Sequence, residues 1–236
     1  MTDTENLVFL FDVDNTLLDN DRVAHDLRHF LIQNFGVERQ NCYWQHFEQL
    51  RNELGYADYL GALQRYRVEF PRDPHMLKVS EFLIDYHFAN RLYPGSLDAI
   101  ERLKQWGATV ILSDGDAVFQ PRKVERSGLW DAVDGRVLIY IHKEQMLEDV
   151  EQRYPARHYV MVDDKIRILT AMKKIWGKRL TTVFVAQGHY ANDTAEVSKY
   201  PPADVSVLRI GELATAELPM LVREPVSRER DLGMVG

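Results

Sequence analysis

The chain has 236 residues, of which 45% are hydrophobic, so it can bury a core for one sizeable domain or for a core domain with a smaller appendage. Its formal net charge of -7 argues against a sequence-independent nucleic-acid binder, because such proteins need clustered lysine and arginine to neutralise phosphates. Cys42 is the single cysteine, so the chain cannot form a disulfide with itself.

The start of the chain, MTDTENL, lacks the basic and apolar regions of a secretory leader. No apolar run reaches the roughly 18 residues that a membrane-spanning helix needs. We therefore expect a cytoplasmic protein without membrane or nucleic-acid partners. Its partners are expected to be small molecules or a metal ion, and nothing in the sequence sets the number of subunits.

Six short apolar runs predict strands at residues 7–13, 109–114, 136–141, 158–164, 181–186 and 204–210. Most of these runs are uninterrupted rather than alternating, and helical patterns lie between them. Such runs are typical of a mainly parallel sheet with both faces covered, and they predict a doubly wound, Rossmann-like α/β fold. In these sheets, binding sites lie at the carboxyl ends of the strands.

The interval from residue 20 to 93 has helical patterns and no convincing strand. Gly36, Gly55 and the segment FPRDPH divide it into helices within 21–36, 39–55, 56–70 and 75–92. Because this interval follows the first strand directly, we expect it to lie over the carboxyl end of that strand. The predicted organisation is a core of residues 1–19 and 94–215, an α-helical cap of residues 20–93 and a charged tail of residues 216–236.

Four of the predicted strands end in residues suited to phosphate and metal chemistry. They are Asp12 and Asp14 after the first strand, Ser113, Asp114 and Gly115 at the second, Lys143 after the third, and Asp163 and Asp164 at the fourth. The hydroxyl of Ser113 and the flexible backbone at Gly115 offer donors to an anion, and Lys143 adds a mobile positive charge. So many carboxylates are tolerable only beside a hard cation, and oxygen ligands with phosphate favour Mg²⁺.

The sequences DVDNT and SDGD, Lys143 and the sequence VDDK resemble, in this order, the four motifs of the haloacid dehalogenase superfamily. The segment YPGSLDAIERLKQWGATVILSDGD is similar to the family's approach to its second motif. The resemblance covers the chain to about residue 213. It implies a Mg²⁺-dependent phosphohydrolase for a small phosphorylated metabolite, with a small α-helical cap.

The resemblance also implies a role for each motif. Asp12 is then the nucleophile that forms an aspartyl-phosphate, and Asp14 protonates the leaving alcohol and later deprotonates the attacking water. Asp12, the backbone carbonyl of Asp14 and Asp163 hold the metal, and Lys143 offsets the charge of Asp12 and the phosphoryl oxygens. The phosphate-binding residues are Ser113, Asp114 and Gly115. In this family, an acid at the position of Asp14 favours phosphoryl transfer, because a halide leaves without protonation.

Three positions depart from the family pattern: Val162 replaces a glycine, Arg167 replaces an acid and Asp114 replaces an asparagine. Either Asp164 takes the place of the missing acid, or Arg167 turns away from the site, so Asp164 is an alternative to Asp163 as metal ligand. Asp114 places extra negative charge beside an anion site.

Other interpretations stay open from the sequence. A phosphomutase or a phosphonate hydrolase shares the core, although Lys78 is the only lysine in the insert for a Schiff base. A receiver-like signalling domain or a degenerate, non-catalytic member that binds phosphate or a partner also combines acids, a hydroxyl and a lysine. Lys123 is expected to be an exposed surface lysine, and Tyr56, Tyr59, Arg65, Tyr66 and Arg67 are expected to pack or be solvated rather than reach a substrate.

Overall fold

The computed structural model describes residues 7–73 and 76–222. Its sheet has six strands in the order β3-β2-β1-β4-β5-β6, and every neighbouring pair is parallel. The strands are β1 (Leu7–Phe11), β2 (Ala108–Asp114), β3 (Val137–Tyr140), β4 (His158–Asp163), β5 (Leu180–Val185) and β6 (Val205–Val207). The chain moves outward from β1 to β3 and then returns to the other side of β1, so the predicted doubly wound α/β fold is confirmed.

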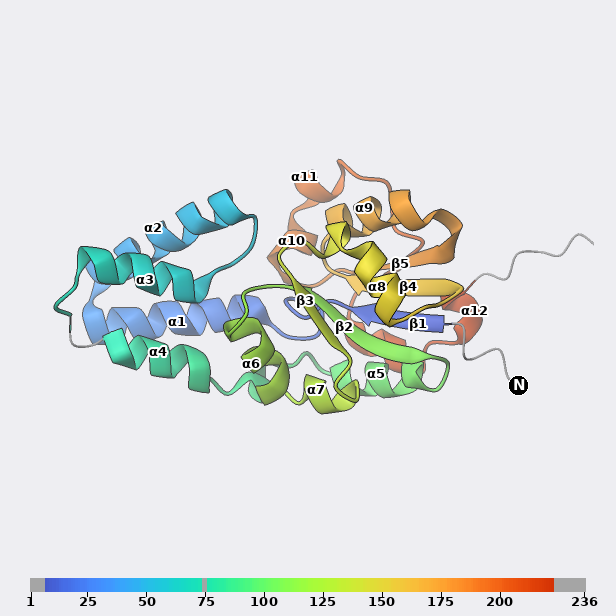
Figure 1. Cartoon of the computed structure of the whole chain (residues 1–236), viewed down its shortest axis with the longest axis horizontal. Helices are drawn as coiled ribbons and strands as arrows, with labels where there is room; N and C mark the ends of the chain where they lie inside the picture. The colour runs from blue at the N-terminus through green and yellow to red at the C-terminus, as the bar shows by residue number, and fades with distance from the viewer. Residues whose placement is uncertain (1–6, 74–75, 223–236) are drawn as a thin grey trace, which may run out of the picture.

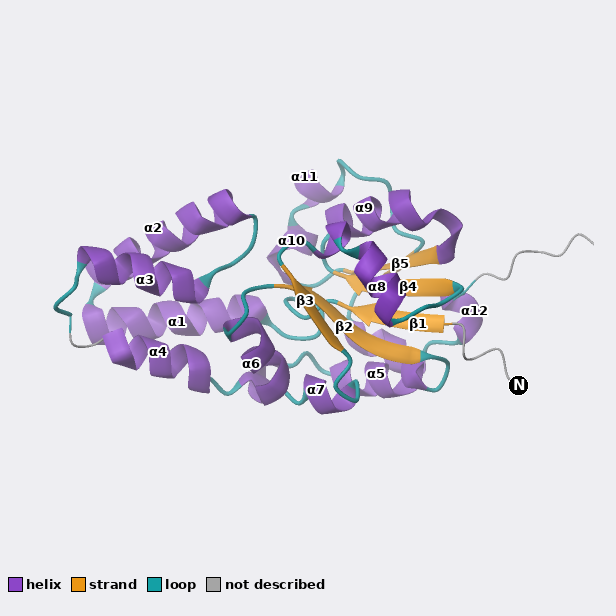
Figure 2. Ribbon diagram, in the orientation of Figure 1, coloured by secondary structure: helices purple, strands orange, loops and turns teal. Residues whose placement is uncertain are grey.

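Helices cover both faces of the sheet (Figures 1 and 2). Phe9 and Phe11 of β1 belong to one buried cluster, whereas Val8 and Leu10 belong to a second one, as expected from the alternation of side chains along a strand. The first cluster includes side chains of α5 (Ser96–Lys104), α6 (Phe119–Arg126) and α7 (Leu129–Ala132). The second includes side chains of α8 (Leu147–Arg153) and α9 (Ile166–Trp176). Each buried aliphatic or Phe side chain contributes roughly 1.5–3 kcal/mol to this packing.

The predicted insert between the first two strands is helical. It contains α1 (Asn20–Phe35), α2 (Val37–Leu54), α3 (Tyr59–Glu69), α4 (Met76–Asp85) and the 3₁₀ turn η2 (Phe88–Arg91). The side chain of Asp19 caps α1, Gly55 ends α2 in the left-handed region with φ of 80°, and the side chain of Asp58 caps α3. We call α1 to α4 the helical insert; Figure 1 shows it beside the sheet.

The two chain segments that connect the helical insert to the sheet lie against each other. The backbone N–H of Asp19 donates to the carbonyl of Arg91 at 2.8 Å, and that of Tyr93 donates to the carbonyl of Leu17 at 2.9 Å. The buried Ser96 hydroxyl also donates to the Leu17 carbonyl, at 2.8 Å. The insert is therefore attached through one paired crossing directly after Asp12 and Asp14.

Short elements complete the described chain: η3 (Lys143–Gln145), η4 (Gly177–Arg179), α10 (Gly188–Asn192), α11 (Thr194–Val197), η5 (Ile210–Thr215) and α12 (Leu218–Leu221). Leu221 is fully buried in the first cluster, and the carbonyl of Ala216 accepts from Arg102 Nε at 3.1 Å. The structure thus differs from the predicted tail, because residues 216–221 pack on the core. The rest of that tail, residues 223–236, lies outside the described residues.

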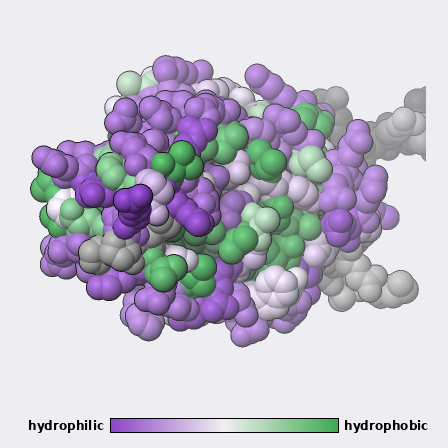
Figure 3. Space-filling view, turned by 60° about the vertical axis from the view of Figure 1, so that its left-hand side comes forward, coloured by the Kyte–Doolittle hydropathy of each residue, from purple (hydrophilic) through white to green (hydrophobic). Residues whose placement is uncertain are grey.

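The surface mixes polar and apolar side chains. From the side of the helical insert, hydrophilic residues cover most of the molecule, with apolar groups in patches between them (Figure 3). Such mixing is ordinary for a folded chain, whose polar side chains cannot cover its whole surface. Among the described helices, none combines the length and the apolar character that crossing a membrane requires.

Candidate active site

Three carboxylates meet beneath the carboxyl ends of β1 and β4. Asp12, Asp163 and Asp164 are all buried, and each offers a carboxylate oxygen within 4.8 Å of the others. The backbone fixes them, because the N–H of Asp12 extends the β1–β4 ladder to the carbonyl of Val162 at 3.0 Å, and the N–H of Asp164 donates to Thr16 Oγ1 at 3.0 Å. The sheet therefore gathers acids that lie about 150 residues apart in sequence.

Lys143 supplies positive charge to this cluster. Its Nζ donates to Asp12 Oδ1 at 2.5 Å and lies 2.7 Å from Asp163 Oδ2, and its side chain is only 1% exposed. Burial opposes the charge of this ammonium group, but Asp12, Asp163 and Asp114 outweigh burial and raise the pKa of Lys143. The lysine is therefore charged in the folded protein, and it forms ion pairs with two of the three buried acids.

Several oxygens of the cluster make no hydrogen bond to the described part of the protein. Within the described chain, Asp12 Oδ2 and both carboxylate oxygens of Asp164 have no hydrogen-bond partner although they are buried. Burial raises the pKa of Asp163 to about 6 and, more strongly, raises that of Asp164. Bare buried carboxylates are costly, so these oxygens are suited to ligate a cation.

Ser113 and Asp114 end β2 beside the cluster. Ser113 Oγ lies 3.5 Å from Asp12 Oδ1 and accepts from the buried Gln120 Nε2 at 3.0 Å. Asp114 Oδ1 accepts from the backbone N–H of Lys143 at 2.7 Å, which positions the turn that carries the lysine. Burial raises the pKa of Asp114. Asp114 thus holds Lys143 through its backbone.

Gly115 does not present the free amide that the sequence suggested. Its N–H donates to the carbonyl of Tyr140 at 2.9 Å, so it continues the β2–β3 pairing. A Cβ at this position would lie 2.5 Å from Cβ of Gln120. Glycine is therefore required for the close approach of Gln120, which in turn supports Ser113.

Asp14 is not part of the three-acid cluster and pairs with a different lysine. Lys123 Nζ donates to Asp14 Oδ1 at 2.6 Å and to Asn20 Oδ1 at 2.9 Å. The Lys123 side chain is fully buried, whereas that of Asp14 is 21% exposed. The prediction of an exposed Lys123 was wrong, because α6 packs its buried face under the start of α1.

A cavity of about 400 Å³ separates the helical insert from the strand ends. Asp14, Asp114 and Lys123 of the core line it, whereas the buried Asp12 does not. The insert contributes an aromatic wall, formed by Trp44, Phe47, Tyr56 and Tyr59. Tyr56 and Tyr59 thus border the cavity, contrary to the expectation that favoured packing alone, although Tyr59 also packs on Phe47 at a centroid distance of 4.7 Å.

The other residues of α3 that were expected to pack or be solvated, Arg65, Tyr66 and Arg67, do not line the cavity. Arg65 forms an ion pair with Glu53 at 2.5 Å, and Tyr66 donates to Asp73 at 2.7 Å. Arg167 lies outside the acidic cluster, where its Nη1 pairs with Glu144 at 2.9 Å, but it does not leave the site altogether, because it lines the cavity. Asp164 lies in the cluster, so the fourth strand provides two acids there.

Lys165 is a site residue to which the sequence analysis gave no role. It lines the cavity, and its Nζ lies 4.8 Å from the ring centroid of Tyr190. Burial opposes its charge, but Asp12 and Asp164 outweigh burial and raise the pKa of Lys165. Its position directly after two acids at a strand end is the feature of the sequence that could have indicated a role in the site. Lys123 and Gln120 carried no such signal.

Comparisons with known proteins agree with this geometry. The family model for haloacid dehalogenase-like hydrolases matches residues 7–175. The chain is similar to a haloacid dehalogenase-like hydrolase of Burkholderia xenovorans LB400, with 66% identity, coverage of 90% of this chain and 99% of that one, and a TM-score of 0.87. Comparison with curated proteins gave no match.

Two more distant structures share the fold alone. The L-2-haloacid dehalogenase of Xanthobacter autotrophicus with covalently bound chloropropionic acid is 18% identical, covers 88% of this chain and 96% of its own length, and has a TM-score of 0.58. The HAD-hydrolase YfnB of Bacillus subtilis, bound to magnesium, is 17% identical over the same shares, 88% and 96%, with a TM-score of 0.60.

Proposed function

Because the chain belongs to the haloacid dehalogenase-like hydrolases, we propose that it is a Mg²⁺-dependent phosphohydrolase that acts on a small phosphorylated metabolite. The observation that carries the proposal is the buried cluster of Asp12, Asp163 and Asp164 with Lys143, whose chain neighbours Asp14 and Lys165 line the cavity. Asp14 supports phosphoryl transfer over dehalogenation, because an alkoxide leaving group needs a proton and a halide does not.

The three-acid cluster fits a magnesium ion. Mg²⁺ takes oxygen ligands, and Asp12 Oδ2 and the carboxylate of Asp164 have oxygens without a protein partner among the described residues. We propose Asp12, Asp163 and Asp164 as side-chain ligands, with the backbone carbonyl of Asp14 beside them. A bound Mg²⁺ would neutralise part of the charge on the phosphoryl oxygens. The magnesium bound to YfnB, which shares this fold, supports the choice of metal.

The proposed reaction uses Asp12 and Asp14 in two steps. A carboxylate oxygen of Asp12 attacks phosphorus while the bond from phosphorus to the leaving oxygen breaks, and Asp14 gives its proton to that oxygen. Water then attacks the phosphorus of the aspartyl-phosphate, Asp14 takes a proton from the water, and Asp12 and inorganic phosphate are released. Lys143 holds Asp12 in place at 2.5 Å, and Ser113 is positioned to donate to the phosphate.

We propose that the helical insert is the cap of this enzyme. Trp44, Phe47 and Tyr59 form an apolar wall opposite the acidic strand ends, so the organic part of a substrate would contact them while its phosphate faces the core. The chain enters and leaves the insert through the paired segments around Leu17 and Tyr93, and side-chain contacts such as the ion pair of Arg126 with Asp85 also join the insert to the core. Opening and closing about that crossing would break such contacts. The core is then formed by the strands and their covering helices.

The first test is a turnover screen with two substrate classes. We expect p-nitrophenyl phosphate or a member of a phosphorylated-metabolite panel to be hydrolysed with Mg²⁺ and not with a chelator. Chloride release from 2-chloropropionate, in contrast, would assign the chain to dehalogenase chemistry, as in the Xanthobacter neighbour. No turnover of either class by folded protein would favour a non-catalytic, phosphate-binding member.

Asp14→Asn is expected to lower phosphate hydrolysis about 10²- to 10⁴-fold, the usual contribution of a general acid or base. The amide cannot give or take the proton, but its oxygen can still accept from Lys123. Steady-state kinetics would measure kcat. The matched control is Asp19→Asn on the same segment, since Asp19 caps α1 and asparagine caps equally well. Unchanged kcat in Asp14→Asn would remove Asp14 from the mechanism.

Magnesium should stabilise the protein more as the pH rises through about 6. Burial raises the pKa of Asp163 to about 6, above the roughly 3.9 of an unfolded aspartate. The folded state therefore binds more protons than the unfolded state between these values, so without metal this group's contribution to stability falls as the pH rises. Mg²⁺ competes with those protons, and its effect grows once they dissociate.

Thermal melts with Mg²⁺ or chelator at about pH 5 and about pH 8 would measure this effect. We expect a larger Mg²⁺-dependent rise in Tm at the higher pH for the wild type. Asp163→Asn should reduce that rise at both pH values. Equal Mg²⁺ shifts at both pH values in the wild type would argue against metal binding at Asp163.

A further inference from the structure

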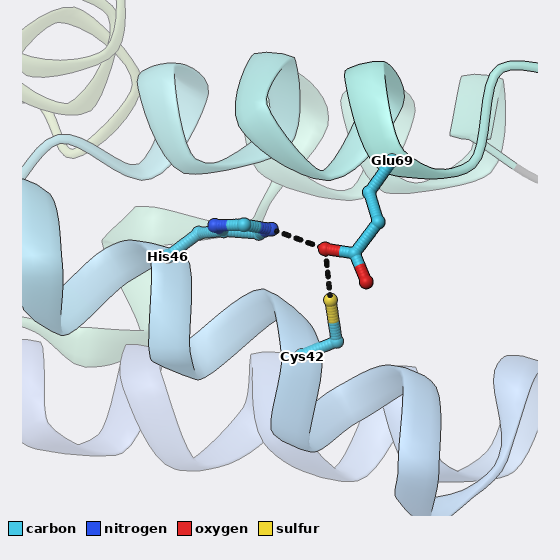
Figure 4. Close-up of side chains that lie close together, drawn as sticks. All are labelled: Cys42, His46 and Glu69. Atoms are coloured by element: carbon cyan, nitrogen blue, oxygen red, sulfur yellow. Dashed lines mark hydrogen bonds and ion pairs between the residues drawn. The ribbon is translucent and has the colours of Figure 1, made fainter.

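A second cluster of ligand-type side chains lies in the helical insert, outside the candidate active site. Cys42 and His46 are four residues apart on α2, so they share one face, and Glu69 is the last residue of α3 (Figure 4). Glu69 Oε2 lies 3.0 Å from His46 Nε2 and accepts from Cys42 Sγ at 3.3 Å. The ligand atoms of all three residues lie within 4.8 Å of one another.

The donor set has the composition of a zinc site. Sulfur, imidazole nitrogen and carboxylate oxygen are the three ligand types that Zn²⁺ takes from proteins, and a hard ion such as Mg²⁺ does not choose thiolate. Bonds of about 2.0–2.3 Å to a tetrahedral ion put neighbouring ligand atoms roughly 3.5 Å apart. The observed separations of 3.0 and 3.3 Å need only a small outward movement of Glu69, whose side chain is 52% exposed.

The alternative role of an activated thiol does not suit Cys42. Reactive cysteines have a lowered pKa and lie near positive charge. Cys42 Sγ instead contacts the acidic Glu69, and burial and Glu69 raise the pKa of Cys42 to about 11 against the opposing effect of Arg39. The cluster also lies apart from the cavity, which none of its three residues lines. A role in attacking the substrate is therefore unsupported by the geometry.

We propose that Cys42, His46 and Glu69 bind a Zn²⁺ ion that ties α2 to α3, with a fourth position left for water. The same two helices carry Trp44, Phe47 and Tyr59, which line the cavity. An ion between them fixes the aromatic wall from its outer side. The ion thus stabilises the helical insert, and it is distinct from the metal proposed for the acidic cluster.

Co²⁺ is the most specific probe of this site, because a thiolate-to-cobalt band can arise only from Cys42, the single cysteine in the chain. Co²⁺ titrated into metal-free, reduced wild-type protein should give a thiolate-to-cobalt charge-transfer band in the near ultraviolet, with the intense visible bands of four-coordinate cobalt. Zn²⁺ should then displace it and remove the bands. Absence of the charge-transfer band in excess Co²⁺ would overturn the proposal.

Substitutions test the contribution of each of the three ligands to Co²⁺ binding, and they distinguish the proposed zinc site from the acidic cluster. Cys42→Ser should lose the charge-transfer band, and His46→Gln and Glu69→Gln should each weaken Co²⁺ binding about tenfold or more. Asp163→Asn, which alters the acidic cluster, should keep the band at full intensity. If neither His46→Gln nor Glu69→Gln changes the affinity, the three-ligand site is wrong.

Thermal melting gives an independent readout that does not depend on activity. Zn²⁺ should raise the Tm of the wild type and of Asp163→Asn by several degrees, and should leave that of Cys42→Ser unchanged. The three ligands are only partly buried or exposed, so the variants are expected to fold. An equal Zn²⁺ shift in wild type and Cys42→Ser would place the zinc elsewhere and contradict the proposal.

Discussion

Asp12→Asn is expected to abolish phosphate hydrolysis, with kcat lower by about 10⁴-fold or more. The reason is that an amide oxygen does not form a covalent phosphoryl intermediate at a useful rate, and no other described carboxylate occupies the same position against Ser113 and Lys143. Steady-state hydrolysis of the best phosphorylated substrate, with saturating Mg²⁺, measures this loss.

The fold of this variant should be preserved. Asparagine has nearly the same shape, and its side-chain oxygen can still accept from Lys143 Nζ. The matched control is Asp98→Asn, an exposed acid of α5, which should keep wild-type activity. Retention of a tenth or more of the wild-type kcat by a folded Asp12→Asn protein would remove Asp12 as the nucleophile.

Lys143→Met is expected to cost about 3–5 kcal/mol of unfolding free energy in the absence of metal, the usual loss when one partner of a buried ion pair is removed. Asp12 and Asp163 would then face each other and Asp164 without the ammonium group of Lys143, with which both form ion pairs. Methionine fills a similar volume, so the loss reports charge rather than a cavity. Urea unfolding with chelator at about pH 8 measures it.

Magnesium should restore part of the stability of Lys143→Met, because a cation in the cluster supplies charge that the lysine no longer provides. Activity should not return, since Lys143 also positions Asp12. Lys104→Met is the control: Lys104 pairs with Asp134 at the surface, and its loss should change stability little. A cost for Lys143→Met as small as that of Lys104→Met would mean that the acids are protonated or solvated without their lysine.

Much of the core could be predicted from the sequence, because the patterns that indicate its strands extend over only a few neighbouring residues. Uninterrupted apolar runs are typical of strands covered on both faces, and all six predicted strands exist with ends shifted by no more than a few residues. The polar residues that end these runs predicted the cluster of Asp12, Lys143 and Asp163. Parallel strands bring their carboxyl ends to one edge, so the approximate meeting of these residues follows from the fold class alone.

Other features depended on packing between distant segments. Lys123 has no local pattern that marks it as buried, and only the placement of α6 beneath the start of α1 brings its Nζ to Asp14 and Asn20. The amide of Gly115 was expected to be free, but the β2–β3 pairing uses it. The ion pair of Arg167 with Glu144 could not be predicted either, because it depends on how η3, which carries Glu144, lies against α9, which carries Arg167.

The sequence by itself determined the element types, the order of the motifs and the chemistry available at the strand ends, because hydrophobic periodicity and residue type act over a few neighbouring residues. Only the tertiary structure decided which acid pairs with which lysine, and which side chains border the cavity. It also brought Glu69 to Cys42 and His46 across two helices. Such contacts are set by how helices and strands pack, and the side chains that form them lie far apart along the chain.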